Sequence, residues 1–568
     1  MLLGYLFTLS LSLLLASLLA LLIRCRKELF ATLSPIIDYK LALVPIACIL
    51  FFFLFSIMFV SPAEQLYFDE NIYQGIAINI LAHGNALWCQ YGSGLLTSCF
   101  TNSIYHDAIG YPFLLSIAFL FFGIGINTAF AMQLFIGLLS IAFFFLLSSI
   151  LFQKRMAIAA STIIFTLIPQ LFIWSRAQAI PDLALMCFAI LTFFLFVFFT
   201  REPKLERFAL FASALVFTIY MRIEGILLLP IFAVLFFAHG ADGIRETMRK
   251  RLGLVIDSIN NNTKFLALSL FFFVLLMPEI YYLAIQISNP SYGQDYTGQQ
   301  VFSVANFMNN IGPNVLFFLG NYNSVSQFPL GFPVETTALA GVGILLLLMS
   351  KSRNKYGTIL LLALWLFAYH LFYDFFYAGA ATFGVDVRFM LELCPALALL
   401  AGIGISELSE LVGGAIKSPR LGLMFYLLVL LGGVIVPFAL FVPNITLKPQ
   451  QMPQQTVIYD ALSFFYSNYN KVPAGCMVYT FTPDLWYEFN RSAAQINYLG
   501  SSDPQFVNDT RGYSCSVIDY GYWCSVPPYK GTTCKNLVQS YNLVTLASQN
   551  NTARGENFAF YKIVGKKG

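Results

Sequence analysis

Two adjacent acidic residues, Asp69 and Glu70, are the first side chains whose type and place could support chemistry. They follow the apolar run 41–60 by nine residues, and Tyr73 lies just beyond them. A carboxylate beside a membrane helix can act as a general base toward a hydroxyl group, or help hold a divalent cation against a phosphate. The alternative is a helix N-terminus, where both acids would meet the macrodipole of 70–82. We favour a functional role, because charge is scarce in this chain.

A third acid, Asp182, follows Arg176 and Pro181 at the start of another apolar run. It is a candidate for holding a metal or contacting an acceptor. Pro181 and Asp182 would equally suit an ordinary helix start, and the two roles are compatible. His106 closes the polar region that follows Glu70. A lone histidine is more often structural than catalytic, so His106 is a supporting candidate only.

Two arginines interrupt apolar sequence at positions that could meet an anion. Arg222 stands two residues before Glu224, and Arg388 stands two residues after Asp386. The guanidinium group offers a planar fork of donors that matches phosphate oxygens. For Arg222 the alternative is a snorkelling anchor at the membrane surface. Glu224 and Asp386 are kept as supporting candidates.

His370 and Asp374 lie one turn apart on the predicted helix before Arg388. The favoured interpretation is a satisfied polar pair that lines the helix bundle, with a supporting role in chemistry as the alternative. No soluble-enzyme signature competes with these candidates. The sequence contains no His-Glu-x-x-His, no Walker-type lysine loop and no Gly-x-Ser-x-Gly elbow.

Composition shows which elements must position these residues. Of the 568 residues, 58% are hydrophobic and only 11% are charged, whereas a soluble domain this long would carry about 25% charged residues. Basic residues are spread over short loops, so no nucleic-acid surface is expected. We predict a polytopic α-helical membrane protein with about 12 transmembrane helices, each near the roughly 20 residues that cross a bilayer. They span 2–23, 41–60, 127–152, 156–174, 182–200, 207–221, 224–239, 265–287, 334–350, 357–377, 389–405 and 421–443.

Basic clusters set the predicted orientation of these helices. The positive-inside rule places all of them in the cytoplasm. Because 41–60 then runs outward and Lys154 must lie inside, only one further crossing fits between them. We interpret 111–124 as a re-entrant or interfacial helix, since it is too short to span comfortably. The alternative is that one cluster breaks the rule. The clusters are 24–27, 154–155, 201–207, 245–251, 351–355 and 417–420.

The last part of the chain differs in composition from the rest. It has polar turns and Pro-rich stretches, and it contains no membrane-length apolar run. We therefore predict a transmembrane domain, 1–443, with a long first outer loop, 61–110, and a small extracytoplasmic α/β domain, 444–568. The predicted tail elements are helices at 456–469 and 483–489 and strands at 476–481 and 494–499.

Cysteines occur in even numbers in both regions predicted to lie outside the cytoplasm. Cys89 and Cys99 share the first loop, and four more lie in the tail. Even counts are what disulfides in an oxidising compartment require, although they also arise by chance. We predict a Cys89–Cys99 bridge and two tail bridges with one of three connectivities. Zinc is the alternative in the tail, but no pair there has Cys-x-x-Cys spacing. The tail cysteines are Cys476, Cys515, Cys524 and Cys534.

In this order, the motifs resemble those of the type-C glycosyltransferase superfamily, most closely the protein O-mannosyltransferases and the lipid A aminoarabinose transferase. Asp69-Glu70 with Tyr73 resembles the acidic motif of that family's first loop, and Asp182 resembles its second-loop acid. Residues 106–112 look like its proline-containing segment before a membrane helix. The likeness covers most of 41–443 in short motifs.

The two arginines also fall in motifs that resemble this family. Residues 222–230 are similar to its basic-Gly-Leu-Pro stretch, and 388–395 to its late Arg-Phe/Tyr-to-Pro motif. Departures are Asp107-Ala108 in place of Pro-Pro, the insertion of two residues between Arg222 and the following glycine, and an extra N-terminal helix. The Trp-Trp-Asp motif of oligosaccharyltransferase is absent from the tail, which argues against transfer of a whole glycan to asparagine.

The resemblance implies a hexosyltransferase that uses a polyprenyl or dolichyl phosphate monosaccharide as donor. The sugar would pass with inversion to a protein, lipid or glycan acceptor at the outer face of a cell or endoplasmic reticulum membrane. Asp69 would be the base, Arg222 and Arg388 would stabilise the departing lipid phosphate, and Glu70 and Asp182 would contact the acceptor or a divalent metal.

Two other classes of membrane protein remain as alternatives to an enzyme. A polytopic transporter would carry polar residues near the membrane midplane, whereas here acids and arginines cluster at predicted outer helix ends. A non-catalytic membrane assembly factor would need no acidic motif. Loss of activity on Asp69→Asn would distinguish an enzyme from such a factor.

Overall fold

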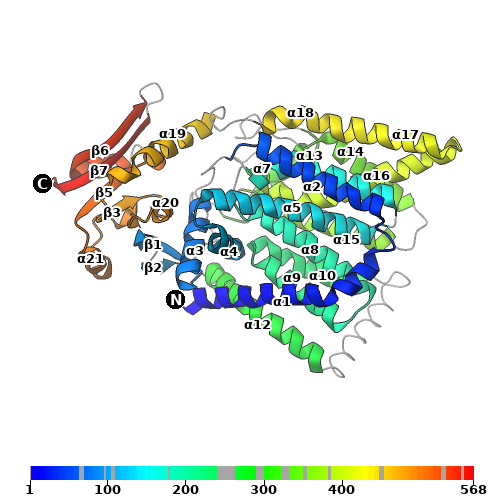
Figure 1. The fold of residues 1–568 in the computed structure, drawn as a ribbon, viewed down its shortest axis with the longest axis horizontal. Coiled ribbons are helices and arrows are strands. Elements are labelled where there is room, and N and C mark those ends of the chain that lie inside the picture. The colour runs from blue at the N-terminus through cyan, green and yellow to red at the C-terminus, as the bar shows by residue number, and fades with distance from the viewer. Residues whose placement is uncertain are drawn as a thin grey trace.

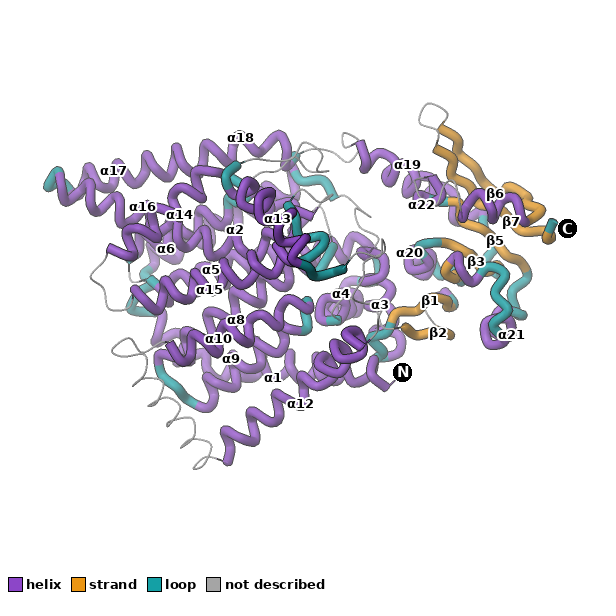
Figure 2. The backbone as a smooth tube through the Cα atoms, turned by 180° about the vertical axis from the view of Figure 1, so that it is seen from behind, coloured by secondary structure: helices purple, strands orange, loops and turns teal. Residues whose placement is uncertain are grey.

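The computed structural model describes residues 2–62, 69–94, 98–103, 109–152, 154–176, 179–238, 263–288, 300–320, 332–349, 355–381, 386–446, 453–525, 533–551 and 556–567. Figure 1 shows a bundle of long helices on one side and a smaller sheet with short helices on the other, and Figure 2 shows the same arrangement from behind.

Within the described residues, eight helices are long and apolar enough to cross a membrane. A ninth span is possible if α6 and α7, which meet at 52°, form one bent crossing. The polytopic helical fold expected from composition is therefore confirmed. The helices of the bundle are α1 (Leu2–Leu33), α2 (Tyr39–Phe59), α3 (Asp69–His83), α4 (Gly110–Phe122), α5 (Ile126–Leu151), α6 (Arg155–Thr166), α7 (Pro169–Arg176), α8 (Asp182–Arg201), α9 (Leu205–Ile219), α10 (Leu228–Ala238), α12 (Thr263–Ser288), α13 (Val304–Phe318), α14 (Val334–Met349), α15 (Lys355–Phe375), α16 (Cys394–Ala415), α17 (Pro419–Leu430) and α18 (Val436–Ile445).

Three of the expected spans are helical but shorter than a bilayer is thick. Helices α9, α10 and α14 have 15, 11 and 16 residues. At 1.5 Å per residue they extend about 17–24 Å, less than the roughly 30 Å of a hydrocarbon core. The 13-residue α4 is also short, and it ends with Phe121 and Phe122 exposed. Its expected place at the membrane interface stays a prediction.

Two helical spans form the centre of the bundle. In the spans Asp182–Arg201 and Arg388–Ala415, 89% and 94% of the most apolar window is buried, against 22–28% in α2 and in the span formed by α17 and α18. Large rings fill the space beside them, such as Phe193 stacked on Trp365 at 3.9 Å between centroids. The candidate residues Asp182 and Arg388 are therefore the first residues of these two deeply buried spans.

One seven-stranded sheet forms the other part of the molecule, in the order β2-β1-β4-β3-β5-β7-β6. Strand β3 runs parallel to β4 and β5, and the remaining pairs are antiparallel. The helices of the tail pack beside it. These elements are β1 (Trp88–Gly92), β2 (Cys99–Ser103), α19 (Pro453–Asn468), β3 (Cys476–Thr480), α20 (Pro483–Glu488), β4 (Ala493–Gln495), α21 (Pro504–Thr510), β5 (Cys515–Tyr520), α22 (Tyr522–Ser525), α23 (Thr533–Ser540), β6 (Tyr541–Asn551) and β7 (Glu556–Lys566).

The sheet contains strands from both ends of the sequence. Strands β1 and β2 belong to the predicted first loop, yet Tyr91 of β1 pairs with Ala494 of β4 in the tail. The Trp88 Nε1 group donates to a carboxylate oxygen of Asp484 at 3.1 Å. Helix α3 packs close to the same carboxylate, since a Cβ on Gly75 would lie 1.7 Å from an oxygen of Asp484. The first loop and the tail therefore fold as one unit.

Three disulfides hold this unit together. Cys89–Cys99 closes the β1–β2 hairpin, as expected. In the tail the pairs are Cys476–Cys515 and Cys524–Cys534. Cys476 and Cys515 stand directly opposite each other on the neighbouring strands β3 and β5.

Candidate functional site

A buried ion-pair network forms where α8 begins and the chain leaves α9. The Arg222 Nη1 group donates to Asp182 Oδ1, and its Nε donates to Glu224 Oε2 at 3.0 Å. The Arg222 side chain is 8% exposed, against 0% for Asp182 and 3% for Glu224. Arg222 has an extended backbone between α9 and the 3-10 turn η2 (Ile223–Leu227), which lets its side chain turn toward α8. Arg222 thus lies inside a carboxylate network and not at an exposed surface.

Arg222 and Arg388 contact the same aromatic ring. The Arg222 Cζ atom lies 5.2 Å from the Phe389 centroid, and the Arg388 Cζ atom lies 4.7 Å from it. Both distances are within the range of a cation–π interaction. Phe389 belongs to the 3-10 turn η3 (Asp386–Leu393), which leads into α16. The structure therefore brings Asp182, Arg222 and Arg388 to one place, although the sequence separates them widely.

The first turn of α3 contacts the segment that leads into α8. Glu70 is fully buried, and its Oε1 accepts a hydrogen bond from the Ala179 N–H at 3.0 Å. Asp69, at the first residue of α3, is partly exposed beside it. Because Ala179 stands three residues before Asp182, the acidic pair on α3 lies next to the ion-pair network.

Two tyrosines join the start of α4 to the same region. Tyr73 packs edge-to-face on Tyr111, with 5.7 Å between ring centroids. The Gly110 N–H donates to the Tyr220 carbonyl at 2.6 Å, two residues before Arg222. Tyr111 is fully buried and interacts electrostatically with both Glu70 and Asp182. The supporting candidate Tyr73 thus contacts a tyrosine that interacts with both the acidic pair and the ion-pair network.

One acid of this region, Glu392, was not selected from the sequence. It is 1% exposed and interacts electrostatically with Asp182, Arg222 and Glu224. Its carboxylate oxygens accept no hydrogen bond from any residue that the structure describes. The sequence could have indicated Glu392, because a carboxylate in an apolar run four residues after Arg388 is costly to bury and is usually functional.

The remaining candidates lie elsewhere. His370 Nε2 is 3.5 Å from Asp374 Oδ2, and the other Asp374 oxygen accepts from the Asn314 side chain at 2.8 Å. This pair therefore lies between α13 and α15 and is no part of the arginine network as described. His106 and the side chain of Asp386 lie outside the described residues.

The described acids do not form a metal site. No group of three or more His, Cys, Asp or Glu side chains among the described residues could hold a metal ion. Asp182 is paired with Arg222, and Glu70 accepts from Ala179. The described residues therefore assemble no set of ligands for the expected divalent cation, and no chemical step below passes through one.

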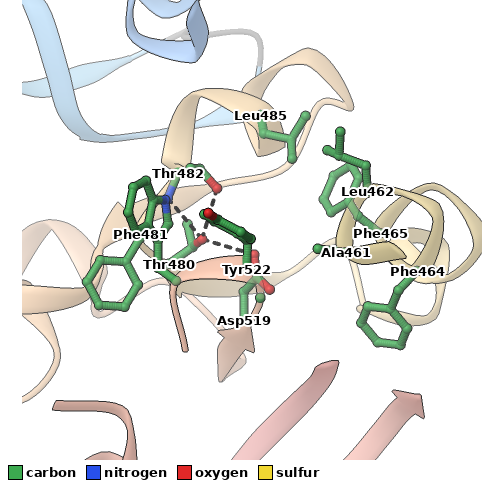
Figure 3. Close-up of a pocket in the computed structure, with 12 residues that line it drawn as sticks. Ala461, Leu462, Phe464, Phe465, Thr480, Phe481, Thr482, Leu485, Asp519 and Tyr522 are labelled. Atoms are coloured by element: carbon green, nitrogen blue, oxygen red, sulfur yellow. Dashed lines mark hydrogen bonds between the residues drawn. The ribbon is translucent and has the colours of Figure 1, made fainter. Parts of the chain in front are cut away.

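A pocket lies in the tail, at the carboxyl ends of β3 and β5 (Figure 3). Asp519 Oδ2 accepts from Thr480 Oγ1 and from Trp486 Nε1, both at 2.9 Å. Burial raises the pKa of Asp519 to about 6, although both hydrogen bonds favour its ionised form. The apolar wall of the pocket includes Leu462, Phe465 and Leu485. The sequence analysis did not select this aspartate.

Comparison with known proteins gives a likeness in structure. No family model and no curated protein matches the sequence. The structure of ArnT from Cupriavidus metallidurans bound to undecaprenyl phosphate matches with a TM-score of 0.56 at 13% identity, covering 92% of this chain and 98% of that one. The apo Archaeoglobus fulgidus oligosaccharyltransferase matches with a TM-score of 0.51 at 12% identity, covering 92% of this chain and 74% of that one. The same oligosaccharyltransferase with Zn and sulfate gives a TM-score of 0.50 at 12% identity, covering 90% and 72%.

At these identities the likeness is one of fold alone, and the chain shares the polytopic membrane fold of ArnT and of the oligosaccharyltransferase.

Proposed function

We propose that the protein transfers a sugar from a polyprenyl or dolichyl phosphate donor to an acceptor at the outer face of the membrane. The observation that carries this proposal is the pair of arginines on the Phe389 ring, beside the buried Asp182. Buried charges in a membrane protein are costly and usually serve an ion, a partner or a substrate. The fold supports the choice, because a structure with the same fold is bound to undecaprenyl phosphate.

In this proposal the arginines stabilise the leaving group. The acceptor oxygen attacks the anomeric carbon, the bond from that carbon to the phosphate oxygen breaks, and the lipid phosphate departs with the electron pair. The guanidinium groups of Arg388 and Arg222 would meet the negative charge that develops on the phosphate. Arg388 is partly exposed whereas Arg222 is buried, so a lipid phosphate could reach Arg388 more readily, and we expect donor binding to depend more strongly on Arg388.

Asp69 is the proposed base. It stands at the first residue of α3, and the neighbouring Glu70 is held by the backbone just before Asp182. Asp69 is partly exposed where Glu70 is fully buried, so an acceptor hydroxyl could reach it more readily. The acceptor proton would pass to Asp69 as the new bond forms. Attack from the face opposite the departing phosphate would give inversion at the anomeric carbon.

An apolar groove on the flank of the bundle suits the lipid tail of the donor. It lies between α2, α6 and α18, where about 900 Å³ of space, part of it open to the surroundings, is bordered by Phe51, Phe55 and Phe438. An isoprenoid chain needs only apolar surface, which this groove supplies.

The test uses the full-length protein in lipid nanodiscs with a panel of labelled polyprenyl and dolichyl phosphate sugars. We expect one donor to be consumed. A general base contributes about 10²–10⁴-fold, so Asp69→Asn should lower turnover by that order while donor binding persists. Arg388→Met should weaken both donor binding and turnover. The control is Arg420→Met, since Arg420 is exposed at the start of α17.

Two outcomes would overturn the proposal. Consumption of none of the donors would point to a transporter or an assembly factor. Full transferase activity in Asp69→Asn would remove the proposed base.

A further inference from the structure

Three asparagines line one face of α13 at intervals of four residues, namely Asn306, Asn310 and Asn314. Residues four apart on a helix lie one above the other, so the three amides point the same way. They meet the end of α15 and the turn that follows it. None of the helices predicted from the sequence covers this segment, so no role had been expected for it.

Asn310 binds backbone oxygens at the end of α15. Its Nδ2 group lies 3.1 Å from the Asp374 carbonyl and 2.7 Å from the Phe376 carbonyl, with the Tyr373 carbonyl at 3.4 Å. The last carbonyls of a helix have no partner within the helix and need donors from elsewhere. Asn310 is buried, so its amide supplies such donors where water is largely excluded.

Asn314 joins the end of α15 to the next turn. Its Nδ2 group donates to Asp374 Oδ1 at 2.8 Å and to the Gly379 carbonyl at 3.0 Å. Its Oδ1 accepts from the Ala381 N–H at 2.6 Å. Asn314 is fully buried, and both of its amide hydrogens and its oxygen are used. The turn is tight, because a Cβ on Gly379 would lie 1.8 Å from the Tyr373 carbonyl.

The segment held by these amides supports the ring that both arginines contact. Tyr373 stacks on Phe389 with 5.1 Å between centroids, and Phe376 meets Phe389 edge-on at 5.6 Å. Contacts therefore connect α13, through the end of α15, to the Phe389 ring and to the guanidinium groups of Arg222 and Arg388 that lie against it.

We infer that Asn310 and Asn314 are positioning residues for the phosphate of the donor. By fixing the backbone of residues 373–381 they fix the Phe389 ring, and the ring sets where Arg222 and Arg388 present their donors. The inference rests on the proposed function and deepens it, because it assigns α13 to the phosphate site. Neither asparagine is taken to touch the substrate.

The test measures binding of lipid phosphate without a sugar, together with donor KM and kcat. In Asn310→Ala and Asn314→Ala we expect both ligands to bind about tenfold more weakly, the size of one or two lost hydrogen bonds. The pH dependence of kcat should stay that of the wild type, since the base is untouched. The matched control is Asn309→Ala, because Asn309 belongs to the same helix but is exposed.

A second substitution covers the case in which the alanine variants do not fold. Phe389→Leu removes the ring and keeps apolar bulk, so it should weaken lipid phosphate binding by a similar factor, and Phe389→Tyr should restore it. Wild-type-like binding in Asn314→Ala, or an equal loss in Asn309→Ala, would overturn the inference while the proposed function stands. If the wild type binds no lipid phosphate and consumes no donor, the proposed function itself fails.

Discussion

Removing the cation of the buried network should destabilise the bundle strongly. In Arg222→Met, Asp182 and Glu224 lose the partner that compensates them, and both side chains are at most 3% exposed. Breaking a buried ion pair by removing one partner typically costs about 3–5 kcal/mol, and we expect a loss of that size in the free energy of unfolding.

Two comparison variants separate charge from packing. Asp182→Asn leaves the Arg222–Glu224 pair in place, so its cost should be closer to the roughly 1.5–3 kcal/mol of one hydrogen bond to a charged group. A triple variant, Asp182→Asn with Arg222→Met and Glu224→Gln, removes all three charges of the two Arg222 ion pairs. It should recover most of the stability that Arg222→Met loses, because neutral replacements of buried ion pairs are often well tolerated.

Four buried free cysteines provide the assay. Cys25, Cys48, Cys187 and Cys394 are buried thiols, so a thiol-reactive fluorogenic dye reports unfolding of the bundle in detergent. Titration with denaturant gives the free energies. If Arg222→Met is as stable as the wild type, or if the triple variant is less stable than Arg222→Met, the electrostatic reasoning is wrong.

Three further expectations concern the tail. Burial raises the pKa of Asp519 to about 6, against about 3.9 in an unfolded chain, so the folded tail keeps a proton that the unfolded tail releases between these values. The contribution of Asp519 to the free energy of unfolding should therefore be greatest below about pH 4 and fall by about 2–3 kcal/mol by about pH 6. Urea unfolding followed by tryptophan fluorescence measures this pH dependence, and Asp519→Asn should reduce it. An unchanged pH dependence in Asp519→Asn would contradict the prediction. Replacing Cys476 and Cys515 by serine should lower the stability of the fold by about 2–4 kcal/mol. The loss should exceed that from replacing Cys524 and Cys534, because the two bridges close separations of 39 and 10 residues. Limited proteolysis measures both losses of stability, and equal losses would count against the reasoning. In sealed vesicles the tail should lie outside the cytoplasm, and protease protection showing it inside would overturn the topology.

The membrane fold and much of the site were accessible from the sequence. Long apolar runs predict spanning helices because the bilayer leaves few other options. Scarce charges in such runs are conspicuous, which is why Asp182, Arg222 and Arg388 were selected before their proximity was known. Their contacts were not accessible, because nothing local in the sequence shows that both guanidinium groups meet the Phe389 ring or that Arg222 pairs with Asp182.

Two other features depend on contacts between distant segments. Strand β1 is only five residues long, and nothing local indicates that Tyr91 will pair with Ala494. Helix α13 was not predicted from the sequence, because Gly312 and Pro313 usually end helices and its asparagines suggest a loop. Those asparagines are useful for the same reason, since their amides satisfy backbone groups of another helix.

The mixed origin of the sheet has a consequence for biosynthesis. Trp88 and Asp484, which hydrogen-bond across it, are 396 residues apart in the chain. At about 5–20 residues per second, the β1–β2 hairpin exists for roughly 20–80 s before its partner strand has been made. During that interval β1 presents an unpaired edge, a form of surface prone to pairing with other chains. The Cys89–Cys99 bridge can close within the hairpin alone, so it would keep the hairpin in shape until the ribosome has finished the tail.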